Sequence, residues 1–225
     1  MKKLIIFVFV LLAINIKVAN GENLNYVTLF NSIELNADVQ VILTQSDQQS
    51  VSIDADENTH NLIETKVRNN ILIINETGTI SKLNPVKVYV SMKSLNRIIV
   101  TGSGTVITQS KFIADDLSLC ITGKGNISMD IAANTISSEI AGNGNIKLKG
   151  MAGTHSFTIA GGGNLDAVDL ETFKTFAMVA SSGNCYLNVK DNLDIKMYGN
   201  GSLVYKGSPK ITMNKSIAMG KVEAL

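Results

Sequence analysis

The chain has 225 residues with 20 Lys or Arg and 19 Asp or Glu, which gives a formal net charge of +1 at pH 7. This balance argues against a nucleic-acid partner, because such a partner requires a basic face. The 18 glycines, two prolines and absent tryptophan favour strands and turns over a helix bundle.

Residues 1–21 have the features of a secretory signal peptide. Lys2 and Lys3 precede an apolar run, and small residues end at Gly21, where we expect cleavage. The 17 basic and 19 acidic residues that remain give the mature chain a formal charge of −2. The apolar run is shorter than the roughly 20 residues of a membrane helix, and no later segment reaches that length. We therefore expect an exported protein of the periplasm, cell surface or extracellular space that does not span a membrane after cleavage.

Residues 22–97 contain short alternating segments that predict irregular coils and a cap. Apolar and polar residues alternate in 39–43, 51–55, 71–74 and 86–90, with polar turns between these segments. Residues 57–67 also fit a short helix, so this stretch has two interpretations. A cap here would protect the first strand edge of a stack from aggregation.

A glycine phrase recurs through residues 98–207. Its last glycine stands at 104, 125, 144, 163, 183 and 201, so the steps are 21, 19, 19, 20 and 18 residues. A period of this size over six copies is typical of stacked coils rather than of a globule with one closed core. We expect one elongated all-β domain over residues 22–225, with about 19 residues per coil and a second cap over residues 208–225.

The positions around the glycine phrase predict two strands in each coil. Apolar residues stand five positions before and one position after the Asn of the phrase, which is a period of two on each side of the turn. We attribute the glycines to corner backbone angles that other residues adopt poorly, and the stacked asparagines to a hydrogen-bonded ladder. The predicted corner and ladder residues are Gly125, Asn126, Gly144, Asn145, Gly163, Asn164, Gly183 and Asn184.

With its exported start, its alternating segment up to Thr105 and its Gly-x-Gly-Asn-Ile units, the chain resembles the bacterial family called putative auto-transporter adhesin, head GIN domain. The resemblance covers roughly Tyr26 to Val222. It implies a single-stranded, right-handed parallel β-helix in the cell envelope or outside the cell. It supplies no catalytic residues.

The best acidic cluster comprises Asp166, Asp169 and Glu171, with Tyr186 as an aromatic neighbour. Paired carboxylates could cleave or bind a polysaccharide, and the alternative is a solvated face with ion pairs. The repeat brings Asp166 one coil from Lys147 and, likewise, Asp130 one coil from Lys149.

Metal and cofactor sites are not expected. His60 and His155 are the only histidines and lie far apart in the sequence, which does not support a zinc site. A serine-protease triad built on His155 and Ser156 is disfavoured because adjacent strand residues face opposite ways. Cys120 and Cys185 lie three coils apart, roughly 14 Å at the strand spacing, which is too far for a disulfide.

The leading hypothesis is a non-enzymatic, adhesin-like binding or structural module of the envelope. Its partner would be a polysaccharide or another envelope protein. The alternative is a carbohydrate-active β-helix. A third reading is an assembly module, which would show an uncovered apolar end coil. The sequence leaves the oligomeric state open.

Overall fold

The structure is a computed structural model and describes residues 29–80, 86–215 and 220–225. The predicted signal peptide at 1–21 lies outside these residues and stays a prediction. The described part contains one short helix, α1 (Glu57–His60), and sixteen strands. The first eight strands are β1 (Ser32–Leu35), β2 (Gln40–Gln45), β3 (Ser50–Asp54), β4 (Ile63–Arg68), β5 (Ile71–Glu76), β6 (Lys87–Met92), β7 (Arg97–Val100) and β8 (Thr105–Thr108). The others are β9 (Phe112–Ile121), β10 (Asn126–Ile140), β11 (Asn145–Ile159), β12 (Asn164–Val179), β13 (Asn184–Met197), β14 (Ser202–Lys206), β15 (Lys210–Lys215) and β16 (Lys221–Ala224).

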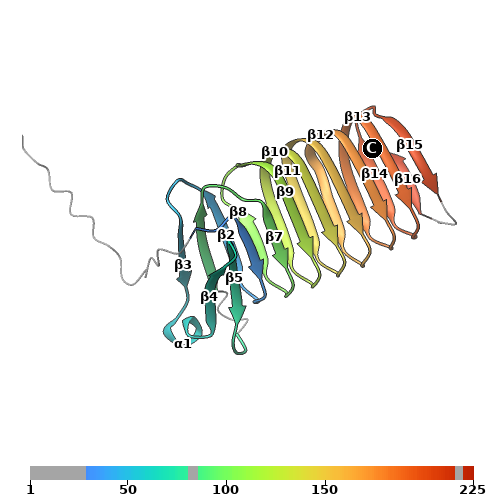
Figure 1. The fold of residues 1–225 in the computed structure, drawn as a ribbon. Helices are drawn as coiled ribbons and strands as arrows, with labels where there is room; N and C mark the ends of the chain where they lie inside the picture. Colours follow the sequence, from blue (N-terminus) through green and yellow to red (C-terminus); the bar gives the residue numbers. More distant parts are fainter. Residues whose placement is uncertain (1–28, 81–85, 216–219) are drawn as a thin grey trace, which may run out of the picture.

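The strands form a parallel β-solenoid of about six coils, spaced about 19 residues apart, which confirms the predicted fold class. Figure 1 shows β9 to β16 stacked along one elongated body. Each of β10 to β13 is a long strand that bends, so its first residues and its last residues belong to different sides of the coil. In β10, for example, the first residues pair with β8 and the later ones with β9. We call the part containing β2, β6, β8, the starts of β10–β13, β14 and β16 the first sheet. We call the part containing β1, β5, β7, β9, the ends of β10–β13 and β15 the second sheet.

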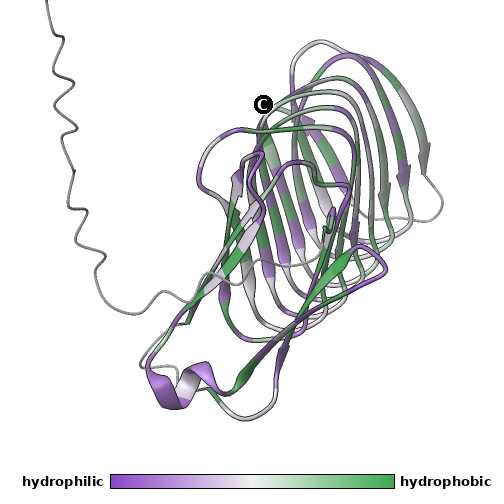
Figure 2. Cartoon of the chain, turned by 60° about the vertical axis from the view of Figure 1, so that its left-hand side comes forward, coloured by the Kyte–Doolittle hydropathy of each residue, from purple (hydrophilic) through white to green (hydrophobic). Residues whose placement is uncertain are grey.

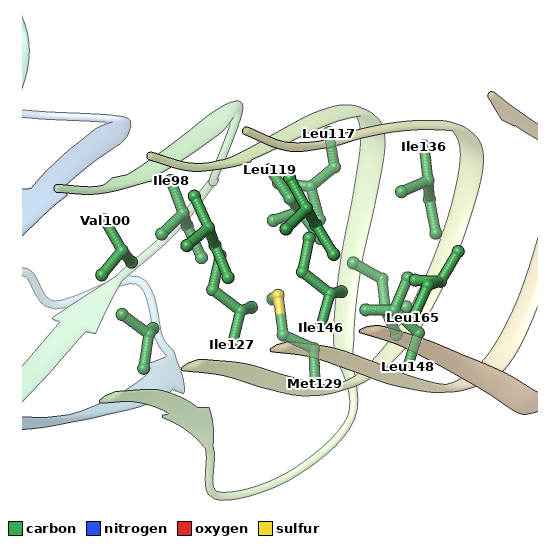
Figure 3. Packing of buried hydrophobic residues seen from close by; sticks show 14 of the residues in the cluster. Ile98, Val100, Leu117, Leu119, Ile127, Met129, Ile136, Ile146, Leu148 and Leu165 are labelled. Atoms are coloured by element: carbon green, nitrogen blue, oxygen red, sulfur yellow. The ribbon is translucent and has the colours of Figure 1, made fainter. Parts of the chain in front are cut away.

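Inward side chains stack in columns to form one continuous core. Ile127, Ile146, Leu165, Cys185 and Leu203 follow one another in register and are buried. Figure 3 shows this packing, with Ile127, Ile146 and Leu165 in successive coils. The alternation of hydrophobic and hydrophilic residues along the strands is visible in Figure 2. Burial of these columns supplies the main stabilisation of the solenoid.

Antiparallel strands cover the N-terminal end of the stack. β3 pairs antiparallel with β6, and β4 pairs antiparallel with β5. The sequence of residues 57–67 fits either a short helix or part of an irregular coil. The structure has both, because α1 occupies only the first turn and β4 begins at Ile63. Asp56 caps α1 by accepting a hydrogen bond from the Thr59 amide at 3.0 Å, and hydrogen bonds from Thr59 lower the pKa of this carboxyl. Figure 2 shows α1 on the outer edge of this end.

The predicted reason for the corner glycines is wrong. Among the described glycines only Gly150 and Gly207 have a positive φ, at 114° and 106°, and neither lies in a corner phrase. The corner glycines are instead pressed against the preceding coil. A Cβ atom on Gly144 would lie 2.0 Å from the Gly125 carbonyl oxygen, and one on Gly163 would lie 1.9 Å from the Gly144 oxygen. Successive corners therefore stack so closely that a carbonyl oxygen occupies the space of a side chain.

The asparagines after the corners form a chain of hydrogen bonds across coils. The Asn145 side-chain amide donates to Asn126 Oδ1 at 3.0 Å, and the Asn164 amide donates to Asn145 Oδ1 at 3.0 Å. Asn184 continues the chain by donating to Asn164 Oδ1 at 3.2 Å. Residues 208–225 include β15 and β16, which add a further coil to the two sheets.

Candidate binding surface on the second sheet

The predicted acidic cluster is divided between separate ion pairs. Asp166 accepts a hydrogen bond from Lys147 Nζ at 2.9 Å, and this bond raises the pKa of Lys147. Glu171 lies 2.6 Å from Lys190 Nζ. The expected pair of Asp130 and Lys149 is also present, at 3.3 Å.

The cluster also spans the bend of the coil. Asp166 and Tyr186 are register neighbours on the outer face of the first sheet, whereas Glu171 follows the bend. Asp169 is exposed and lies opposite Lys149 in register. The structure therefore brings Asp166 and Tyr186 together and places Glu171 with a different lysine.

A patch that the sequence reasoning missed lies on the outer face of the second sheet. Phe176 and Met178 project outward from β12, with 49% and 37% of their surfaces exposed. Ser156 and Thr158 of β11 lie on one side of them, and Asp194 and Lys196 of β13 lie on the other. These six residues surround a hollow of about 400 Å³, and we call them the Phe176 patch.

The orientation of the Phe176 patch follows from its neighbours in β12. Val179 is an inward residue of the repeat, so the period of two turns Thr175 and Ala177 inward and Phe176 outward. A hydrophobicity pattern alone would choose the opposite orientation, because Phe176 and Met178 are more apolar than Thr175 and Ala177. Counting residues from the glycine corner therefore predicts which side chains of β12 face outward, and this count could have identified Phe176.

A second hollow of about 490 Å³ lies on the same sheet nearer the N-terminal end. Its lining includes Asp116, Ser118 and Thr135. Asn134 donates to the neighbouring Asp115 carboxylate at 2.7 Å. The lining side chains are polar apart from Leu117, which is buried, so this hollow lacks the exposed aromatic and Met side chains of the Phe176 patch.

His155 lies in the core, not at a catalytic site. Its side chain is buried, and its Nε2 atom is 3.0 Å from the Oγ atom of buried Ser138, whereas Ser156 faces outward. Burial lowers the pKa of His155 to about 4. A substrate on the surface cannot reach this pair, so the pair belongs to the packing of the interior.

Within 29–80, 86–215 and 220–225, no three His, Cys, Asp or Glu side chains form a group that could hold a metal ion. In the same ranges, no helix combines the length and apolar character needed to cross a membrane. Cys120 faces outward and is partly buried, Cys185 points into the core, and both are free thiols.

Solved structures share this fold over almost their whole length. A putative adhesin from Bacteroides fragilis is 23% identical with a TM-score of 0.82, covering 91% of this chain and 96% of its own. A putative lipid binding protein from Parabacteroides distasonis is 20% identical, with a TM-score of 0.68 and the same two coverages of 91% and 96%. A putative adhesin from Parabacteroides merdae is 19% identical, with a TM-score of 0.68, and covers 91% of this chain and 95% of its own. At these identities the likeness shows the fold alone.

Among curated proteins no sequence matches the chain. The sequence model of one protein family matches residues 29–209, which include all the glycine corners from Gly104 to Gly201. The matched span contains the Phe176 patch and ends before β15. The chain therefore belongs to the family described as putative auto-transporter adhesin, head GIN domain.

Proposed function

We propose that this protein is an exported, non-enzymatic binding module that acts like an adhesin and recognises another envelope or surface protein through the Phe176 patch. The observation that carries the proposal is the exposure of Phe176 and Met178 side by side on a regular sheet. Aromatic residues and Met are enriched in protein interfaces, and a few such residues supply most of the binding energy.

The surroundings of the two apolar side chains fit a specific contact. Asp194 and Lys196 lie beside Phe176 and Met178 in register, so opposite charges border the apolar centre. Ser156 and Thr158 offer hydroxyl groups on the other side. An apolar centre with a polar rim is the usual anatomy of a protein interface.

The state of the acids supports a non-enzymatic role. A glycosidase needs one carboxylic acid that can donate a proton and one carboxylate that is free to act as a base or nucleophile. Asp166 and Glu171 instead hold Lys147 and Lys190 at 2.9 and 2.6 Å. Their charges are thus balanced by separate lysines instead of being directed at one substrate.

A polysaccharide is the second candidate ligand, and a specific feature favours it. The hydroxyls of Ser156 and Thr158 and the Asp194 carboxylate could bind sugar hydroxyls while the Phe176 ring packs against a sugar face. Tryptophan, the largest aromatic platform, is absent from the chain. For this reason we place a protein partner first.

The test compares binding by residues 22–225 with binding by the variant Phe176→Ser/Met178→Ser. Immobilised wild-type protein is presented with isolated envelope proteins and, separately, with a glycan array. We expect one protein partner that binds wild type and loses at least about tenfold affinity with the double variant. The matched control is Ile113→Ser, which removes an exposed apolar side chain outside the patch.

Three results would contradict the proposal. Binding of the partner that is unaffected by the double variant would place the contact elsewhere. Binding to glycans alone would favour the polysaccharide candidate. Release of reducing sugar from an envelope polysaccharide would show an enzyme.

A further inference from the structure

At the C-terminal end of the solenoid, two inward apolar side chains have no cover among the described residues. In β13, Leu193 and Ile195 point into the core with 1% and 0% exposure. Their register partners in β15, Ile211 and Met213, point the same way but are 37% and 42% exposed. The core columns thus continue to the last coil, and no strand or helix within residues 29–80, 86–215 and 220–225 covers them there. Figure 1 shows β15 and β16 at this end of the stack.

The opposite end of the solenoid finishes in antiparallel strands. Val51 of β3 and Ile63 of β4 are buried there, and both strands run antiparallel to their neighbours. A parallel stack that added a further copy at this end would therefore meet strands of the opposite direction. The two ends are not equivalent, and only the C-terminal end continues the parallel coils to an open edge in the described chain.

β16 has backbone groups that point away from the stack. It pairs with β14, and among the described residues no strand lies on its other side. The Lys221 amide donates to the Gly201 carbonyl at 3.2 Å, and the Leu225 amide donates to the Tyr205 carbonyl at 2.8 Å. Because backbone groups alternate in direction along a strand, those of Val222 and Ala224 face the open edge.

Two copies of β16 have complementary charges when they pair antiparallel in one particular register. Lys221 and Glu223 face outward, on either side of Val222, and their register neighbours in β14 are the uncharged Ser202 and Val204. If two copies of β16 pair about a two-fold axis at Val222, each Lys221 lies opposite a Glu223. An axis at Lys221 or at Glu223 would instead place like charges opposite each other, which is unfavourable.

We propose that two copies of this chain associate through their C-terminal ends, with the two β16 strands pairing antiparallel about a two-fold axis at Val222. Val222 then exchanges both backbone hydrogen bonds with Val222 of the second copy. Two ion pairs between Lys221 and Glu223 flank this point. β15 lies half a coil before β16, so the side chains of Ile211 and Met213 from both copies fill the space between the second sheets.

A second copy fits this end better than an unrelated partner. The same short strand supplies both members of each ion pair, and the same face supplies both apolar surfaces. A two-fold contact of this kind closes after two copies, because the same surface is used by both. It also pairs the open edge of β16, and exposed strand edges of this kind promote uncontrolled aggregation.

The first test is sedimentation equilibrium of residues 22–225 with charge variants. We expect wild type to dimerise, and Lys221→Glu or Glu223→Lys to weaken dimerisation by about tenfold or more because two attractive pairs become repulsive. The double variant Lys221→Glu/Glu223→Lys restores both pairs and should return most of the lost affinity. Lys111→Glu, a charge reversal on an exposed residue away from this end, is the matched control.

The second test is disulfide cross-linking in a Cys120→Ser background. Val222→Cys would place two Cα atoms about 5.5 Å apart, which suits a disulfide. Ala224→Cys on the same side of the same strand would place them roughly 14 Å apart. We expect Val222→Cys to form a covalent dimer under mild oxidation and Ala224→Cys to stay monomeric on a denaturing gel.

The proposal is overturned if wild type stays monomeric at high concentration or if the single charge variants dimerise like wild type. Equal cross-linking of Val222→Cys and Ala224→Cys would rule out the register. A ladder of growing oligomers would show head-to-tail assembly instead of a closed pair. Circular dichroism of each variant shows whether a loss of dimer follows from a loss of fold.

Discussion

Ser138 Oγ and His155 Nε2 lie 3.0 Å apart inside the solenoid, where both side chains are buried. They come from neighbouring coils, β10 and β11. The remaining ring nitrogen of His155, Nδ1, is buried and has no hydrogen-bond partner in the described structure. One buried polar atom of the pair, His155 Nδ1, thus lacks a hydrogen bond, which makes this point of the core sensitive to acid.

Acid should destabilise the protein through His155. Burial lowers its folded pKa from 6.5 to about 4, so the folded state keeps the ring neutral while the unfolded state takes up a proton. Stability from this residue is full above pH 6.5 and falls as the pH drops towards 4, by about 3 kcal/mol in total. Urea unfolding at several pH values measures this loss.

The control for the acid effect is the variant Ser138→Ala/His155→Leu, which replaces both polar partners by apolar residues. The core neighbours of His155 in its column include Ile136, so an apolar side chain suits the site. We expect this variant to lose less stability than wild type between pH 6.5 and 4. An identical pH dependence in both proteins would refute the assignment.

Corner glycines should not tolerate a methyl group. Gly163→Ala would place a Cβ atom 1.9 Å from the Gly144 carbonyl oxygen, so the coils would have to separate. We expect a loss of roughly 3 kcal/mol or more in the free energy of unfolding. Gly162→Ala is the matched control, because its Cβ atom would meet only the Asn143 side chain. Equal losses in thermal unfolding would contradict this explanation.

The asparagine ladder should contribute in proportion to its hydrogen bonds. The Asn145 side chain donates to Asn126 and accepts from both the side chain and the backbone amide of Asn164. Asn145→Ala should cost roughly 1 to 2 kcal/mol in the free energy of unfolding. Asn184→Ala removes one side-chain bond, to Asn164, and should cost less. Chemical denaturation of the two variants gives the comparison, and a reversed order would count against the ladder.

The two thiols should differ in reactivity. Cys185 is buried, and burial raises the pKa of its thiol to about 12. Burial also raises the pKa of Cys120, which is only partly buried. Because thiolates react with iodoacetamide, we expect slow modification of Cys120 and protection of Cys185 in the folded protein. Mass spectrometry should find both modified in urea, and rapid modification of Cys185 under native conditions would contradict its placement.

The repeat made the architecture predictable, and particular residues show why. Val179 and Cys185 lie at fixed distances from Gly183, so their inward orientation follows from the period. The reason for the glycines could not be deduced in the same way. The approach of Gly144 to Gly125 is a relationship between coils, and residue-by-residue backbone preferences contain no information about it.

The candidate site was less accessible to sequence reasoning. Asp166 and Glu171 are close in sequence, but the bend of β12 gives them separate lysine partners. Phe176 and Met178 are apolar and so resemble core residues. Their outward orientation follows only from the alternation along β12, in which Val179 faces inward. Ser138 and His155 are seventeen residues apart, and their contact depends on the register between two coils.

The position of the Phe176 patch matters for how a dimer would meet a surface. A two-fold axis along the sheet normal keeps outer faces on the same side, so both copies of the patch would point in one direction. The patch on β12 lies two strands from the open end, which puts its two copies about 30 Å apart at ordinary strand spacing. A partner displayed repeatedly on a cell would then be held at two points, and weak individual contacts would add up to slow detachment.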